Sequence, residues 1–203
     1  MPRDLQFDRD TALDLALDQF WRHGFHDTSM RDLADRLGVS LSSLYHSFGD
    51  KRTLFLAILE RYDTQHIRVR LDRLARERPP LEAIASFFKA VAKEGGADPD
   101  RMGCFLVNTA LELSPHDPEI ARLVRAKILA IRRFLKDRLE AARQDGSLPP
   151  GRDVEHHASH LLGVLLGLRV LARADPDRKM LEGIVRSALA GLENTGKPVP
   201  GRR

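Results

Sequence analysis

The sequence contains few cysteine and few aromatic residues. Among its 203 residues are one cysteine, one tryptophan and two tyrosines. The single cysteine, Cys104, cannot form an internal disulfide. No apolar run approaches the ~18 residues that span a membrane, and residues 1–10 lack the apolar stretch of a secretory signal. These absences predict a cytoplasmic protein in a reducing compartment, with no membrane association.

Signatures of catalysis and of metal binding are also missing. The chain has no phosphate-binding glycine loop, no nucleophile motif and no paired carboxylates on an apolar face. His156 and His160 lie one helical turn apart beside Glu155, but no cysteine and no third spaced ligand completes a metal site. We therefore expect no enzyme, no cofactor and no metal, and we interpret this segment as a solvated helix start.

The charge of the chain is basic overall but unevenly distributed. The formal net charge is +4 and the pI is about 9.5, which favours a polyanionic partner. Residues 1–61, however, hold eight Lys and Arg residues against ten Asp and Glu residues. The basic surplus lies later in the chain, where solvated helix faces explain it. Net charge is therefore poor evidence for nucleic-acid binding.

Apolar residues recur at spacings of three and four along most of the chain, and no segment shows the alternation of a β-strand. This periodicity predicts an all-α fold, which glycine and proline residues divide into about nine helices. The first four are expected at residues 8–23, 29–37, 40–47 and 50–78. The later helices are expected to start after Pro80 and at Asp98–Pro99, Asp117–Pro118, Asp153 and Asp175–Pro176.

The predicted helices form two domains. Residues 1–50 are expected to fold as a helix-turn-helix domain of three helices. Residues 51–196 are expected to form a C-terminal helical bundle for ligand binding and dimerisation, with the helix at 50–78 as the connector. The segment 197–203 is expected to be disordered.

Residues 28–51 carry the clearest functional signal. Two short helices, capped by Ser29 and Ser40, are joined by a sharp turn at Gly38, which predicts a helix-turn-helix. The second helix would enter the major groove of DNA, and affinity would come largely from phosphate contacts. The expected phosphate ligands are the N–H groups of the helix starts, the hydroxyls of Thr28, Ser29 and Tyr45, and the ammonium of Lys51.

The same segment closely resembles the TetR/AcrR family of bacterial regulators. The matching residues are Phe20, Gly24–Phe25, Thr28–Met30, Asp32–Ala34, Gly38–Ser40, Ser43–Tyr45, Phe48, Lys51 and Leu54. The resemblance implies a homodimer that binds double-stranded operator DNA, with the last two helices at the dimer interface and a ligand cavity among the middle helices. It also implies DNA contacts at Arg31, Leu41, Ser42, Ser43, Tyr45, Ser47 and Lys51.

Three positions of the second helix allow more than one interpretation. Leu41 stands where the family often has a polar residue, and it offers only apolar contact, for instance with a thymine methyl. Tyr45 either reaches DNA or fills the turn with its ring. His46 is either a further DNA contact or an ordinary surface residue.

The middle of the chain contains aromatic and polar residues suited to a mostly apolar pocket with a few orienting groups. The candidate ligand-binding residues are Phe87, Phe88, Cys104, Phe105, Asn108, Thr109, Glu112 and Phe134. Ordinary hydrogen bonding between helices explains the polar members equally well. Cys104 is either a buried inert thiol or an electrophile sensor.

Two glycines, Gly163 and Gly167, lie four residues apart in the predicted helix that starts at Asp153. They would let a second helix pack closely, either within one subunit or across a dimer interface, and the family resemblance favours the interface. The leucines expected to supply apolar area there are Leu161, Leu165, Leu168, Leu189 and Leu192.

The function predicted from these features is a DNA-binding regulator, most simply a repressor that a mostly apolar small-molecule effector releases from its operator. The alternative is a helical ligand-binding or electrophile-sensing protein with little affinity for DNA, consistent with the acidic balance of residues 1–61.

Overall fold

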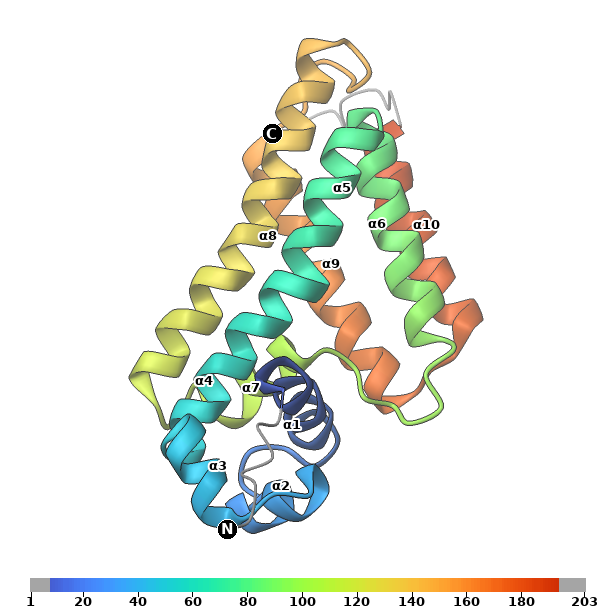
Figure 1. Cartoon of the computed structure of the whole chain (residues 1–203). Helices are drawn as coiled ribbons and strands as arrows, with labels where there is room; N and C mark the ends of the chain where they lie inside the picture. The colour runs from blue at the N-terminus through green and yellow to red at the C-terminus, as the bar shows by residue number, and fades with distance from the viewer. Residues whose placement is uncertain (1–7, 194–203) are drawn as a thin grey trace. The chain divides into compact units, whose positions relative to one another are not determined.

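The computed structural model describes residues 8–193, and within that range every regular element is a helix (Figure 1). The elements are α1 Arg9–His23, α2 Met30–Leu37, α3 Leu41–Phe48, α4 Lys51–Tyr62, η1 Asp63–Arg68, α5 Val69–Glu77, α6 Pro80–Gly95, α7 Phe105–Glu112, α8 Pro118–Gln144, α9 Val154–Ala174 and α10 Arg178–Glu193. The run from α4 through the π-helical turn η1 to α5 is unbroken. Counted as one helix, it gives nine helices in the described chain, so the all-α prediction is confirmed.

The predicted capping residues determine where the early helices begin. Ser29 and Asp32 form a reciprocal capping box at the start of α2. The Ser40 side chain accepts a hydrogen bond from the Ser43 N–H, and the Asp50 carboxylate accepts one from the Thr53 N–H. Gly38 ends α2 in the left-handed conformation, at φ +66°, which permits the sharp turn into α3.

Two predicted helix starts are wrong. Asp98–Pro99 opens a turn and not a helix. Arg101, in this turn, has a φ of +51°, which is outside the helical region, and α7 begins only at Phe105. The last helix is capped by Asp177, whose carboxylate accepts the N–H groups of Lys179 and Met180, and Asp175 instead follows the end of α9.

The chain divides into two compact units. Unit 1 holds the described residues up to Arg70 together with Met102–Ile128, and unit 2 holds Leu71–Arg101 together with the described residues from Leu129 onward. Packing thus associates α7 and the first part of α8 with the N-terminal helices. The predicted boundary at residues 50 and 51 stays a prediction, and the expected disordered tail at 197–203 lies outside the described residues.

Aromatic side chains build the core of unit 1. The Phe55 ring of α4 contacts the Phe20 ring of α1 edge to face at 5.1 Å, and it contacts the Phe105 ring of α7 at 5.4 Å. Leu33 of α2 and Leu44 of α3 are fully buried. The helix-turn-helix therefore shares one continuous core with α4 and α7.

Helices α6, α9 and α10 pack together in unit 2 (Figure 1). The contact between α6 and α9 is so close that a Cβ at Gly95 would lie 2.6 Å from the Cβ of Ala172. Leu161 of α9 and Leu181 of α10 are fully buried. Within residues 8–193, no helix has the combined length and apolarity needed to cross a bilayer.

Candidate nucleic-acid interface

Helix α3 has one buried face and one exposed face. Leu44 and Phe48 point into the core of unit 1, whereas Ser42, Tyr45 and His46 are exposed. Tyr45 has 47% of its surface accessible, so its ring does not fill the turn. The remaining predicted contacts of this helix, Leu41, Ser43 and Ser47, are half-buried along its edges. The exposed face therefore presents small and aromatic side chains that allow a helix to approach DNA closely.

Arg31 on α2 is exposed, whereas Thr28 and Ser29, which lie just before that helix, are occupied by contacts within the protein. Thr28 is fully buried, and its hydroxyl donates to the Gly24 carbonyl at 2.8 Å, so it does not offer that hydroxyl to a phosphate. The Ser29 hydroxyl donates to the Asp32 carboxylate at 2.6 Å, and this bond lowers the pKa of Asp32. Both residues shape the start of α2.

The three helix starts differ in the carboxylates that they carry. At α2 the cap is the Ser29 hydroxyl, and the Asp32 carboxylate in the first turn accepts the Ser29 N–H. At α4 the cap is the Asp50 carboxylate, which accepts the Thr53 N–H, and this bond lowers the pKa of Asp50. At α3 the cap is the neutral hydroxyl of Ser40, and the first turn contains no acid. Since a carboxylate repels a phosphate, α3 has the helix start best suited to a phosphate.

Lys51 lies at the start of α4 and is half-buried. Its Nζ donates to the carbonyl oxygens of Phe25 and Thr28, both at 2.8 Å, and lies 4.3 Å from the centre of the Phe25 ring. An ammonium group has three N–H donors. Two of them hold the turn before α2, which leaves one for a phosphate.

The predicted ligand-binding residues fall into both units. In unit 2, the Phe87 ring contacts Phe88 at 6.0 Å and Phe134 at 6.1 Å. The other five lie in unit 1, on α7 or at its start: Cys104, Phe105, Asn108, Thr109 and Glu112. The structure thus brings together three aromatic residues in one unit and five mixed residues in the other.

The polar residues of α7 already have partners within unit 1. Asn108 donates to the Met102 carbonyl at 2.9 Å, and Thr109 donates to the Phe105 carbonyl at 2.8 Å. Glu112 accepts N–H groups from the turn before α2. Cys104 is buried, with its Sγ 3.4 Å from the Tyr62 hydroxyl. The bonds of Asn108 and Thr109 are local to α7 and the segment before it, whereas Glu112 and Cys104 contact other elements of unit 1.

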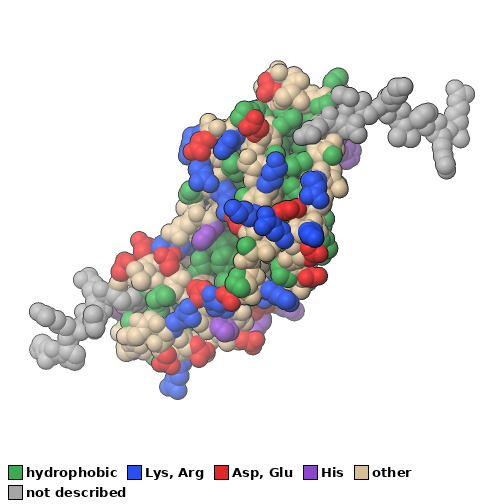
Figure 2. Space-filling view, turned by 90° about the vertical axis from the view of Figure 1, so that its right-hand side faces the viewer, with side chains coloured by type: hydrophobic (Ala, Val, Ile, Leu, Met, Phe, Trp, Pro, Cys, Tyr) green, Lys and Arg blue, Asp and Glu red, His purple; other side chains and the backbone are tan. Residues whose placement is uncertain are grey.

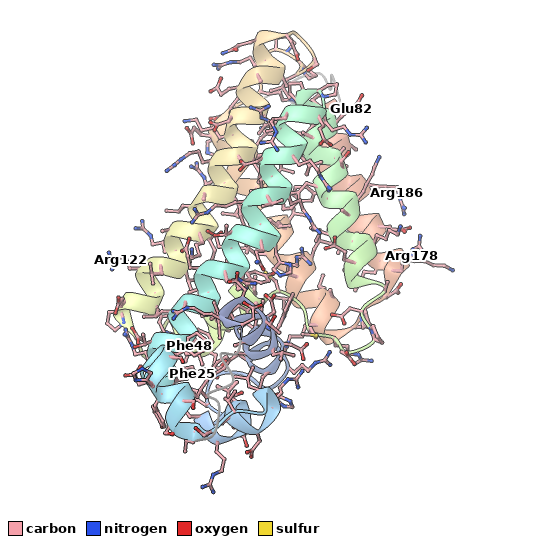
Figure 3. All side chains as sticks on the ribbon, viewed as in Figure 1. Phe25, Phe48, Glu82, Arg122, Arg178 and Arg186 are labelled. Carbon is pink, nitrogen blue, oxygen red and sulfur yellow. The ribbon has the colours of Figure 1, made fainter. Side chains whose placement is uncertain are left out.

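Sequence reasoning missed a groove of about 330 Å³ between α6 and α10 in unit 2. Its apolar lining is Ala92, Val185 and Leu189, and its charged lining is Lys89, Lys93, Arg178, Arg186 and Glu182. Figure 3 shows Arg178 and Arg186 extending outward from α10, and Figure 2 shows Lys and Arg side chains beside apolar ones on the same side of the molecule. No local pattern reveals this groove, because its two walls are about 90 residues apart in sequence.

The candidate dimer residues separate into two groups. Gly163 and Gly167 are exposed, and a Cβ built at either position would meet nothing within 4 Å. The five leucines (Leu161, Leu165, Leu168, Leu189 and Leu192) are at most 8% exposed. Within one protomer the leucines therefore form the core of unit 2, and the glycines mark the open face of α9.

The histidines weighed from sequence as metal ligands lie at the start of α9. His156 Nδ1 lies 2.6 Å from the Asp153 carboxylate, the cap of that helix. Across residues 8–193 no group of three or more His, Cys, Asp or Glu side chains is arranged to hold a metal ion.

Two family models match the chain. Residues 12–58 match the bacterial regulatory proteins of the tetR family, and residues 79–188 match the tetracyclin repressor-like C-terminal domain. Among curated relatives, the HTH-type transcriptional repressor ComR of Escherichia coli K12 is 33% identical over 90% of this chain and 88% of its own. The uncharacterised HTH-type transcriptional regulator YezE of Bacillus subtilis is 30% identical over 95% of this chain and 100% of its own.

A solved structure of a TetR family regulator is also similar to this chain. A cysteine mutant of the TetR family transcriptional regulator CifR, complexed with a 26-base-pair operator duplex, is 32% identical to this chain. It aligns over 93% of this chain and 98% of its own, with a TM-score of 0.81. The similarity therefore covers both the helix-turn-helix and the C-terminal helices.

Proposed function

Because this chain belongs to the TetR family of DNA-binding transcriptional regulators, we propose that it is a homodimeric repressor that a small-molecule effector releases from its operator. Members of this family are regulators and not enzymes. The observation that carries the proposal is the exposed face of α3, with Ser42, Tyr45 and His46 directed away from the core. The relatives named as a repressor and as an operator complex support it.

In the proposed complex α3 lies in the major groove. Ser42, His46 and Ser47 would face base edges, Leu41 would contact a thymine methyl, and Arg31 would approach from α2. Phosphate contacts would come from the Tyr45 hydroxyl, the third donor of Lys51 and the start of α3. Thr28 and Ser29 would support the interface from within.

The open face of α9 supports the proposed dimer. Gly163 and Gly167 have no neighbour within 4 Å of a built Cβ, so a helix of a second copy has room to approach. Val170, one turn further along, is also exposed. A two-fold dimer of this kind implies a roughly palindromic operator with half-sites in successive major grooves.

The effector proposal relies on the aromatic cluster of Phe87, Phe88 and Phe134 in unit 2 and on the α7 residues in unit 1. The expected effector is a mostly apolar molecule with one or two hydrogen-bonding groups. Reciprocity requires that an effector which weakens DNA binding also binds less tightly to the DNA-bound protein, by the same factor.

Selection of DNA duplexes from a random library with the purified protein tests the proposal, followed by a screen for molecules that release the selected duplex. Calorimetric titration of each hit, with and without the duplex, should give affinities that differ by the factor seen in release. Equal affinities would mean that the hit does not control DNA binding. Failure to enrich any duplex would contradict the proposal and favour a ligand-binding protein with little DNA affinity.

A further inference from the structure

The turn between α1 and α2 is held by opposite charges from two distant helices. A single oxygen of Glu112, Oε1, accepts the N–H groups of Phe25 at 2.8 Å and His26 at 2.9 Å. Lys51 donates to the carbonyls of Phe25 and Thr28. Four backbone groups of the turn at residues 24–28 therefore bond to one carboxylate and one ammonium.

Gly24 leaves room for this carboxylate. Residues with a side chain rarely adopt its backbone φ of +83°, and a Cβ at this position would lie 3.0 Å from Glu112 Oε2. Glu112 comes from the last turn of α7, 86 residues beyond His26. Hydrogen bonds to an ionised acceptor are about twice as strong as neutral ones. The contact is thus a long-range anchor of the turn.

The turn leads directly to the DNA-binding helices. Ser29, the cap of α2, follows the turn directly. Helix α2 packs on α3, and Leu33 of α2 and Leu44 of α3 are both fully buried. The Phe25 ring, in the same turn, contacts the Phe55 ring of α4 at 5.1 Å. A shift of the turn would therefore move α2, and with it the exposed face of α3.

We propose that Glu112 is a positioning residue for operator binding, which acts through the turn at residues 24–28 and does not touch DNA. This inference rests on the proposed function, and it differs from the ligand contact predicted for Glu112 from sequence. The carboxylate fixes the orientation of α2 and α3 relative to α4. Loss of the anchor lowers operator affinity because the helix-turn-helix then samples orientations that do not fit the groove.

Three substitutions separate the anchor from general packing. Glu112→Ala removes the acceptor, and Glu112→Asp keeps the charge but withdraws the oxygen by one methylene. Glu112→Gln keeps an Oε1 that accepts both N–H groups. We expect affinity for the selected duplex to fall about tenfold or more for the first two and by a clearly smaller factor for Glu112→Gln, which keeps both bonds but loses the charge that strengthens them. The matched control is Glu82→Ala, an exposed carboxylate of α6 (Figure 3), with affinity unchanged.

Amide hydrogen exchange of Phe25 and His26, measured without DNA, reports on the anchor itself. Exchange at these two amides should accelerate strongly in Glu112→Ala and Glu112→Asp and much less in Glu112→Gln, which keeps the acceptor. If Glu112→Ala or Glu112→Asp exchanges fast but binds the duplex with unchanged affinity, the positioning role is overturned. If exchange stays slow in both Glu112→Ala and Glu112→Asp, the contact of Glu112 with the turn is not an anchor. If Glu112→Ala does not fold, Glu112→Asp gives the same test. If the unmodified protein enriches no duplex, the proposed function fails, whereas the exchange result still decides whether the anchor exists.

Discussion

At the residue scale, Lys51 has a structural role beside the phosphate contact that we propose for it. The sequence predicted a phosphate contact, and the structure shows two hydrogen bonds to backbone carbonyls and a position over the Phe25 ring. These bonds hold the ammonium at the start of α4 and reduce the side-chain entropy that a phosphate contact would cost. The proposed phosphate contact is compatible with this structural role, because the ammonium has three N–H donors and two of them bond to these carbonyls.

The variant Lys51→Ala should weaken binding to all duplexes alike and lower the salt slope of binding by about one unit, since one phosphate contact is lost. It should also lower the melting temperature, because the Phe25 and Thr28 carbonyls lose their partner. Fluorescence anisotropy at several salt concentrations measures the slope. An unchanged slope with a lower melting temperature would leave Lys51 with the structural role alone.

A second residue-scale contact joins α4 to the start of α8. Arg52 donates through Nε and Nη2 to both oxygens of Asp117, at 2.7 and 3.0 Å, and also through Nη2 to Glu119 at 2.7 Å. Asp117 also accepts the first N–H groups of α8. The Arg52 hydrogen bond, helped by these amides, lowers the pKa of Asp117 to about 2. Unit 1 therefore contains an ion pair that forms only when Asp117 is ionised.

This pKa predicts the direction of a pH effect. An unfolded aspartate has a pKa of about 3.9, so the lower folded value means that Asp117 contributes stability above about pH 4 and loses it as pH falls through about 2. Asp117→Asn removes that contribution but still caps α8. Urea unfolding at about pH 6 and about pH 3 should show a smaller pH effect for Asp117→Asn than for the unmodified chain. Equal effects would contradict the prediction, and Asp137→Asn, an exposed position on α8, is the control.

At the element scale, the run α4–η1–α5 departs from a regular helix. The sequence predicted one helix over 50–78, and the structure inserts a π-helical turn at Asp63–Arg68. Asp63 is buried there and accepts hydrogen bonds from Arg68 at 2.6 Å and from Lys127 of α8 at 3.1 Å. Lys127 is also buried and donates to Glu60 at 2.6 Å. The wider turn places an acid opposite the buried lysine.

Breaking this buried pair should be costly. Lys127→Met removes the cation and leaves Asp63 with Arg68 alone, so the free energy of unfolding should fall by about 3 kcal/mol. Urea denaturation monitored by circular dichroism measures the change. Replacement of Arg133, an exposed residue on the same helix, by Met is the control and should change stability by less than about 0.5 kcal/mol. A similarly small effect of Lys127→Met would show that the pair does not stabilise unit 1.

At the scale of the whole molecule, the glycines of α9 allow a direct test of the dimer. A Cβ at Gly167 meets nothing in the protomer, whereas a Cβ at Gly95 would lie 2.6 Å from Ala172. Gly167→Phe should therefore leave the protomer folded and weaken association about tenfold or more by overpacking the interface. Gly95→Ala should instead lower the melting temperature, because α6 and α9 must separate.

Light scattering at micromolar concentration distinguishes these outcomes. The unmodified chain should be a dimer, and Gly167→Phe should shift toward monomer with its melting transition retained. A monomer for the unmodified chain would contradict the dimer proposal. Dimerisation of Gly167→Phe equal to that of the unmodified chain would place the interface elsewhere.

Local patterns in the sequence determined much of this protein. Capping residues such as Ser29, Ser40 and Asp50 specify where helices begin, because the bonds they make span only three residues. Apolar periodicity gave the helical class, and the segment around Gly38 gave the helix-turn-helix. The exposed face of α3 followed from the same periodicity, since burial of Leu44 and Phe48 leaves the opposite side free.

Only the tertiary structure decided which neighbours the polar and apolar side chains contact. Glu112 suits a ligand pocket by sequence, yet it bonds to a turn 86 residues away in the chain. Thr28 resembles a phosphate donor, yet it is buried against Gly24. The leucines of α9 and α10 fit a dimer contact, yet they form the core of unit 2. Such choices depend on which helix faces meet in space, and a repeat of three or four residues does not encode that pairing.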